Sequence, residues 1–245
     1  MEDSAIFNVQ EQWLRPLRCE LNVLSRPDGS AMITQGSYFI LCCYVNTFLY
    51  SYRVHIFFFK GNTAVVAAVY GPVDVKPQRI LVDKASIETV YKPKSGLPNV
   101  ADRMRETIIK NTCETALLSA IHPRTAVCIV LQEMQDSGGL LSCCINAACM
   151  ALMDSGIAMK FLVAAVSCMI SEDDIILDPS DKDLMGSKAS LTFVFDSAKK
   201  NLVASHTSGV FSQEQYHESL LKCRQASCEI FEFYRSLVKK YIICI

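Results

Sequence analysis

Residues 122–156 read HPRTAVCIVLQEMQDSGGLLSCCINAACMALMDSG, and this stretch contains an apolar strand pattern, a turn and a helical pattern in succession. The turn carries a carboxylate followed by Gly138 and Gly139. A glycine turn that runs directly into a helix is how a chain builds a backbone cradle for phosphate. The next two residues, however, are Leu140 and Leu141, which offer an anion only hydrocarbon. The pattern therefore predicts the shape of an anion site without its usual side chains.

Strand and helix patterns interleave along the rest of the chain without a linker. Apolar runs with period-two alternation between turn residues predict strands, and apolar spacing of three to four residues predicts helices. The expected strands lie in 25–36, 62–72, 80–92, 122–135, 159–170, 173–179, 190–197 and 201–209, and the expected helices in 101–121, 140–154 and 212–241. This order favours one α+β domain over residues 1–245.

Capping residues and apolar stripes indicate how the helices begin, end and face the core. Gly156 stands where a helix C-cap belongs, and Ser212 with Gln215 fits a capping box. The stripes expected to face inward are Met104, Ile108, Cys113, Ala116, Leu117 and Ala120 in the first helix and Leu220, Leu221, Cys228, Phe231 and Tyr234 in the last.

Composition limits the classes of function. The chain has 245 residues, 51% of them hydrophobic, with 24 basic and 25 acidic residues and a formal net charge of −1. This charge creates no global field toward nucleic acid or membrane, so any RNA contact requires a local basic patch or a partner. The 12 cysteines follow an acidic, polar N-terminus rather than a signal peptide, and they form no C-x-x-C pair. We therefore expect reduced, mostly buried thiols and no zinc site.

The segment from Ser37 to Lys60, SYFILCCYVNTFLYSYRVHIFFFK, does not match the rest of the chain. It has no acidic residue, many aromatic residues and no consistent periodicity, and its apolar runs are too short to span a bilayer. Deleting it would join two strands as a compact hairpin. We interpret it as an atypical hydrophobic insertion, either a genuine one or the product of a retained intron or gene-model error.

Three stretches carry a resemblance to a known family. They are RPLRCELNVLSRPDGSAMITQG, HPRTAVCIVLQEMQDSGGLLSCCINAACMALMDSGIAMK and ILDPSDKD. Together they resemble the RNase PH family, and the likeness covers nearly all of the chain except Ser37 to Lys60. The resemblance implies an α+β RNase PH-like fold of the ribosomal protein S5 domain 2-like type, in which mixed sheets pack with helices.

The family's active members are phosphorolytic exoribonucleases, in which inorganic phosphate attacks the last phosphodiester bond. Their glycine turn continues into a threonine and an arginine that hold the attacking phosphate, and here Leu140 and Leu141 occupy those positions. A guanidinium offsets the repulsion between phosphate and an anionic backbone, which leucine cannot do. The resemblance thus implies a degenerate phosphate site at Gly138, Gly139, Leu140 and Leu141, with no catalytic residue.

The resemblance also implies a late aspartate cluster and a basic RNA-binding loop. Asp178, Asp181 and Asp183 would be a residual acid or metal site if they converged; the alternative, which we favour, is an acidic surface turn. Lys92, Lys94, Arg103 and Arg105 would contact RNA phosphates, and the alternative is a solvated charged loop.

Two functions follow from these residues. The first is a non-catalytic subunit of the eukaryotic RNA exosome ring, whose partners would be other RNase PH-type subunits, S1/KH cap subunits and single-stranded RNA in the channel, in the nucleus, nucleolus and cytoplasm. The second is an active phosphorolytic 3'-exoribonuclease or a metal-dependent nuclease. A small-molecule enzyme is disfavoured because the chain contains no G-x-G-x-x-G, Walker or G-x-S-x-G motif. We expect no cofactor and no membrane partner.

Overall fold

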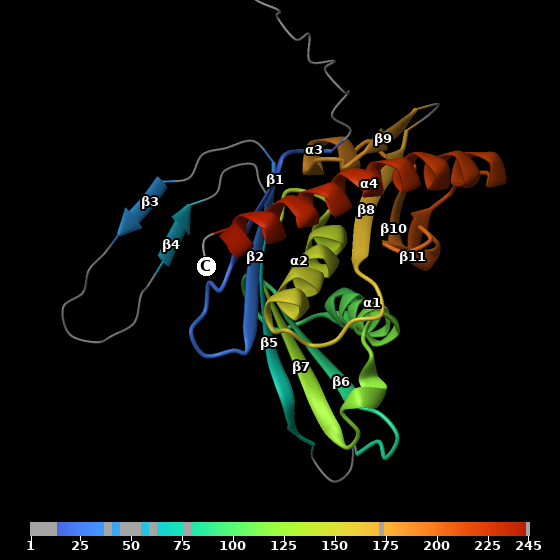
Figure 1. Ribbon diagram of the computed structural model, residues 1–245. Helices are drawn as coiled ribbons and strands as arrows, with labels where there is room; N and C mark the ends of the chain where they lie inside the picture. The colour runs from blue at the N-terminus through green and yellow to red at the C-terminus, as the bar shows by residue number, and fades with distance from the viewer. Residues whose placement is uncertain are drawn as a thin grey trace, which may run out of the picture.

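A computed structural model describes residues 14–36, 41–44, 55–58, 63–75, 80–171 and 174–243. For residues 41–44, 55–58 and 240–243 it describes the backbone only. Figure 1 shows two main sheets with helices between and around them. The predicted α+β class is therefore confirmed.

The larger sheet has five strands in the order β1-β2-β5-β7-β6. All neighbours in it are antiparallel except β6 and β7, which run parallel. Its strands are β1 (Leu17–Leu21), β2 (Gly29–Gln35), β5 (Thr63–Asp74), β6 (Ser86–Lys92) and β7 (Thr125–Gln135). Because β6 stands last in this order, its outer edge pairs with none of the described strands.

The second sheet has four antiparallel strands in the order β11-β10-β8-β9. Every residue of β8 is buried, because α2 covers one face of the sheet and α4 the other (Figure 1). These elements are β8 (Val163–Ile170), β9 (Ile175–Leu177), α3 (Asp181–Leu184), β10 (Ala189–Asp196), β11 (Leu202–Gly209) and α4 (Gln213–Ile243).

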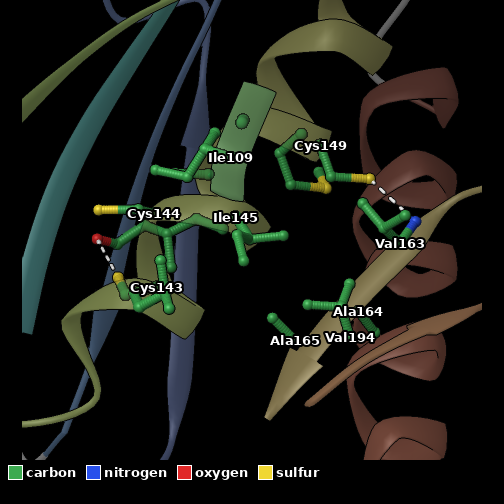
Figure 2. Close-up of a cluster of buried hydrophobic side chains, with 14 of the residues drawn as sticks. Ile109, Cys143, Cys144, Ile145, Cys149, Val163, Ala164, Ala165 and Val194 are labelled. Atoms are coloured by element: carbon green, nitrogen blue, oxygen red, sulfur yellow. Dashed lines mark hydrogen bonds between the residues drawn. The ribbon is translucent and has the colours of Figure 1, made fainter. Parts of the chain in front are cut away.

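Helix α2 (Leu140–Asp154) lies between the two sheets, and residues 140–152 are all buried. Figure 2 shows Cys149 pointing toward Val163 on β8, whose N–H donates to the Cys149 thiol at 3.5 Å. Small residues at the contact between α2 and β2 let the two backbones approach closely. At Gly29 on β2, a Cβ would collide with the Ala151 carbonyl of α2. The central helix is therefore a core element held on both sides.

Helix α1 (Val100–Ala116) packs beside β6 and ends earlier than the sequence predicted. Asn99 and Asp102 form a capping box at its start, and Leu117 ends it before a short 3₁₀ turn at Ser119–Ile121. The predicted stripe is wrong at Met104, which is 47% exposed, and at Ala120, which lies beyond the helix. Ile109 and Thr112 are buried instead.

The remaining elements follow the predictions except at several points. Residues 80–85 precede β6 rather than belonging to it, β7 and β8 begin later than predicted, and neither β1 nor the short helix α3 was predicted. The capping box of α4 is confirmed. The Ser212 N–H donates to the Gln215 side-chain oxygen at 3.0 Å, and the Gln215 N–H donates to the Ser212 hydroxyl at 3.2 Å. Leu221, predicted to face inward, is 44% exposed.

Two short strands, β3 (Leu41–Tyr44) and β4 (His55–Phe58), lie within Ser37 to Lys60 and pair with each other antiparallel. Figure 1 draws this hairpin apart from the two main sheets. Gln35 of β2 is paired with Thr63 of β5, so the ends of the segment meet across one antiparallel ladder. The rest of the segment lies outside the described residues. The interpretation of Ser37 to Lys60 as a genuine insertion, or as the product of a retained intron or gene-model error, stays a prediction. Among the described helices, none is long and apolar enough to cross a membrane.

Candidate functional site

The two glycines of the turn before α2 both have positive φ values. Gly138 and Gly139 have φ values of 100° and 68°, a region that favours glycine. Asp136 fixes the turn by accepting the Gly138 N–H at 3.0 Å. A Cβ on Gly138 would collide with the Pro179 carbonyl, so the loop after β9 lies directly against the turn.

Arg15 and Asp178 occupy the space over this turn. The Arg15 guanidinium binds both carboxylate oxygens of Asp178, at 2.7 and 2.8 Å, and also donates to the carbonyls of Gly138 at 3.1 Å and Ser137 at 3.4 Å. A Cβ built on Gly139 would lie 3.3 Å from an Asp178 oxygen and 3.5 Å from an Arg15 nitrogen. The chain's own ion pair therefore fills the opening of the cradle.

The ion pair is largely buried, and the attraction between its two charges outweighs the cost of burying them. The side chain of Asp178 is 2% exposed and that of Arg15 is 19% exposed. Burial alone would lower the pKa of Arg15, but the hydrogen bond and the attraction from Asp178 outweigh it and raise that pKa above its ordinary value. Asp178 also has a positive φ of 50°, and its N–H donates to the Ser167 carbonyl. Such a conformation persists where the surroundings fix it.

Leu140 and Leu141 turn into the protein rather than toward the cradle. They are 6% and 9% exposed, and both belong to the hydrophobic core. Two buried hydroxyls lie nearby: Ser142 donates to the Gly139 carbonyl at 2.7 Å and accepts from Ser167 at 2.9 Å. The two positions where the family pattern has threonine and arginine thus contribute packing instead of donors.

The structure does not bring the three candidate aspartates together. Asp178 is bound to Arg15, whereas Asp183 caps α3 by accepting from the Ser180 N–H at 3.0 Å and hydroxyl at 2.6 Å. Asp181 is exposed; its pKa is raised by partial burial and by repulsion from Asp136. Among the described residues, no three His, Cys, Asp or Glu side chains converge as a metal site would require.

The four basic candidates lie at the α1 side of the larger sheet and differ in availability. Lys92, Lys94 and Arg103 are exposed. Arg105 is half-buried and makes a 2.6 Å ion pair with Asp102, a residue of the α1 capping box. Three of the four are therefore accessible to an RNA backbone, and the fourth already has a carboxylate partner.

Sequence reasoning missed Arg15 as a site residue. It lies in a stretch that resembles the family, but no periodicity or motif links it to Asp178, 163 positions further along. Thr63 was missed for the same reason; its hydroxyl binds the Gly138 carbonyl and accepts from the Ser137 N–H. Only the folded chain brings these segments to one turn.

Two family models match this chain. The model described as "3' exoribonuclease family, domain 1" matches residues 54–158, and that described as "3' exoribonuclease family, domain 2" matches residues 162–223. Together with the two-sheet fold and the glycine turn, these matches show that the chain belongs to the RNase PH family of 3' exoribonucleases.

Within that family, the sequence resembles the exosome ring subunit called ribosomal RNA-processing protein 46, or exosome component 5, and the comparisons confirm this finer likeness. A protein of Arabidopsis thaliana, "Exosome complex exonuclease RRP46 homolog", is 31% identical, with 91% of this chain and 90% of that protein covered. The Oryza sativa protein of the same name is also 31% identical, with 98% of each covered. The crystal structure of rice Rrp46 superposes with a TM-score of 0.80 at 32% identity, over 95% of this chain and 98% of that one.

Proposed function

We propose that this chain is a non-catalytic structural subunit of the RNA exosome ring. In this role it shapes the channel through which RNA passes for 3'-to-5' processing and degradation, including rRNA maturation and mRNA turnover. The names of its relatives, which are exosome complex proteins, support the assembly. The filled cradle supports the absence of catalysis.

The observation that carries this proposal is the Arg15–Asp178 ion pair over Gly139. A phosphate nucleophile needs charged donors at this point, and Arg15 directs four hydrogen bonds to protein oxygens instead. Each charged hydrogen bond that phosphate lacks is worth about 1.5–3 kcal/mol, and transition-state contacts are often worth more. Two missing donors therefore lower the rate by several powers of ten.

The partners in this proposal are other RNase PH-type ring subunits, S1/KH cap subunits and single-stranded RNA, in the nucleus, nucleolus and cytoplasm. Lys92, Lys94 and Arg103 lie exposed at the α1 side of the larger sheet, where they could contact RNA phosphates. Such contacts are salt-dependent and independent of base sequence.

One assay tests the catalytic part of the proposal. Purified protein, alone and in a reconstituted ring, is incubated with single-stranded RNA, magnesium and inorganic phosphate, with an active RNase PH enzyme as the positive control. We expect no release of nucleoside diphosphates. Leu141→Arg alone should not restore activity, because the threonine is also missing and Arg15 still binds Asp178.

The same assay distinguishes this proposal from the alternative, an active exoribonuclease. The word "exonuclease" in the names of the plant relatives favours that alternative. A nucleoside diphosphate-releasing activity that co-purifies with the chain, and that disappears in a folded Asp178→Asn variant, would overturn the non-catalytic role. Circular dichroism of that variant separates a lost activity from a lost fold.

A further inference from the structure

The side chains of Lys200 and Cys228 meet between the β10–β11 turn and helix α4. The Lys200 ammonium donates to the Cys228 sulfur, with 3.0 Å between Nζ and Sγ, although the two residues are 28 positions apart in the chain. The Cys228 thiol in turn donates its own proton to the Arg224 carbonyl of α4, at 3.7 Å. An amine and a thiol from two different elements are therefore in direct contact.

The backbone on both sides of this contact is held in place. The Asp196 carboxylate accepts the Lys199 N–H at 2.7 Å, and the Asp196 N–H donates to the Asn201 carbonyl at 3.1 Å, so the turn that carries Lys200 is closed by its own hydrogen bonds. On the other side, Cys228 lies within α4, which packs against β8 and β10. The contact thus joins two anchored segments rather than two free chain ends.

Exposure and neighbouring charge set Cys228 apart from the other described cysteines. Seven of the nine described thiols are buried, and the remaining two, Cys128 and Cys228, are partly exposed. Cys128 stands opposite Glu88 in the parallel ladder, and burial and the Glu88 carboxylate raise the pKa of its thiol. Cys228 faces an ammonium group instead. An oxidant attacks the thiolate form of an accessible cysteine, so we expect it to reach Cys228 before the other eight.

We propose that Lys200 and Cys228 form a peroxide-sensitive site, in which oxidation of the thiol leads to a covalent sulfur–nitrogen bond between the two side chains. In the first step, the Cys228 sulfur attacks one oxygen of hydrogen peroxide. An S–O bond forms, the O–O bond breaks, and the hydroxide that leaves takes up the thiol proton to give water. The sulfur loses the electron pair that the peroxide gains, and Cys228 becomes a sulfenic acid.

Lys200 completes the reaction because its nitrogen lies beside the oxidised sulfur. A sulfenic acid condenses with a nearby nitrogen to form a sulfenamide. After the ammonium group has given one proton to water, the Lys200 nitrogen attacks the sulfur, an S–N bond forms and the S–O bond breaks. The leaving hydroxide takes a second proton from the nitrogen and departs as water, so this step needs no further oxidant. The product joins the β10–β11 turn to α4.

Peptide mass spectrometry of the peroxide-treated chain tests for this bond. We expect a cross-linked pair of peptides that contain Lys200 and Cys228, with the summed mass of the two peptides less two hydrogen atoms, and we expect dithiothreitol to separate them. Lys200→Arg keeps the positive charge, but a guanidinium does not give up its proton in proteins. This variant should therefore form no link, and its Cys228 should react with dimedone as a sulfenic acid. The matched control Lys199→Arg should form the link as the original chain does.

The melting temperature provides a second readout, because the bond closes a loop between residues 28 positions apart. A cross-link of this length should raise the melting temperature of the peroxide-treated chain by about 5–10 °C, and dithiothreitol should reverse the rise. Cys128→Ser should show the same rise, because Cys128 takes no part in the reaction. Cys228→Ser should show none.

Three outcomes would overturn the inference. They are oxidation of Cys128 ahead of Cys228, oxidation of Cys228 that leaves Lys200 unlinked, and a product in which oxygen remains between the nitrogen and the sulfur. The inference does not depend on the function proposed above, because neither residue belongs to the candidate site.

Discussion

Arg15 lies over the glycine turn, where its guanidinium binds Asp178 and the Gly138 carbonyl. The pair it makes with Asp178 is largely buried and joins the start of the described chain to the loop after β9. Removing one partner of such a pair leaves the other charge buried and unpaired, which costs more than the pair itself contributes.

We therefore expect Arg15→Met to lower the free energy of unfolding by about 2–4 kcal/mol, near the lower end of the range for buried pairs because Arg15 is partly exposed. Urea denaturation monitored by circular dichroism measures this change. Arg26→Met removes an exposed arginine and should change stability by less than about 0.5 kcal/mol. Equal changes in the free energy of unfolding for the two variants would mean that the Arg15–Asp178 ion pair does not stabilise the fold.

The exposed lysines beside α1 allow a prediction about RNA. Lys92→Ala with Lys94→Ala should weaken binding of single-stranded RNA to the reconstituted ring and reduce the slope of log K against log salt by about 1.4, or about 0.7 for each phosphate contact. Fluorescence anisotropy between about 50 and 200 mM salt measures both the affinity and the slope. The control pair Lys182→Ala and Lys199→Ala, also exposed, should leave the slope unchanged, and identical slopes for both pairs would exclude the loop from RNA contact.

At the scale of elements, Asn146 links three of them. From the middle of α2, its side chain accepts from the Ala165 N–H at 2.8 Å and donates to the Ala165 carbonyl at 3.0 Å, so it completes the backbone bonding of β8. The Tyr234 hydroxyl of α4 also donates to it, at 3.1 Å. One buried amide therefore fixes the positions of α2, β8 and α4 relative to one another.

Asn146→Ala should destabilise the fold by about 2–4 kcal/mol, because it leaves two buried backbone groups and a buried hydroxyl without partners. Tyr234→Phe removes only one hydrogen bond and should cost about 1 kcal/mol. Thermal and urea unfolding of the two variants provide the comparison. If Asn146→Ala were no more harmful than Tyr234→Phe, the backbone bonds of Asn146 would be unimportant to the packing.

The elements also show what a sequence can predict and why the rest escapes it. Strands such as β7 and β8 were predicted because apolar and β-branched runs between turn residues require a buried sheet. β1 was missed because its five residues alternate too briefly, and Met104 and Leu221 were misplaced because a helical stripe is wider than the face that packs. The turn before α2 could be predicted from Gly138 and Gly139, whereas the position of Arg15 over it depends on a contact across 163 positions that only folding creates.

The whole molecule has a core rich in buried thiols. Desolvation raises the pKa of Cys19, Cys113 and Cys149 from the ordinary 9.0 to about 12. Below pH 9 these thiols are protonated in both the folded and the unfolded chain, so they do not affect the pH dependence of stability. Between pH 9 and 12 the unfolded chain loses these protons and the folded chain keeps them, so stability falls as pH rises.

We expect the free energy of unfolding to fall by about 1.4 kcal/mol per pH unit for each such thiol above pH 9. Replacing Cys19 and Cys113 by alanine should make this alkaline slope shallower by about two such increments, whatever the change in absolute stability. Urea unfolding at a series of pH values between 8 and 11 measures the slopes. If the original protein and the alanine variant gave parallel slopes, these thiols would have the same pKa in the folded chain as in the unfolded chain.

The central claim for the whole molecule is that its inherited anion cradle is closed by Arg15 and Asp178. The most direct measurement is a crystal structure of the chain soaked in orthophosphate at high concentration. The account predicts that the Arg15–Asp178 pair remains and that no phosphate contacts the turn at Gly139. A well-occupied phosphate beside Gly139, with Arg15 turned away from Asp178 toward it, would contradict the account.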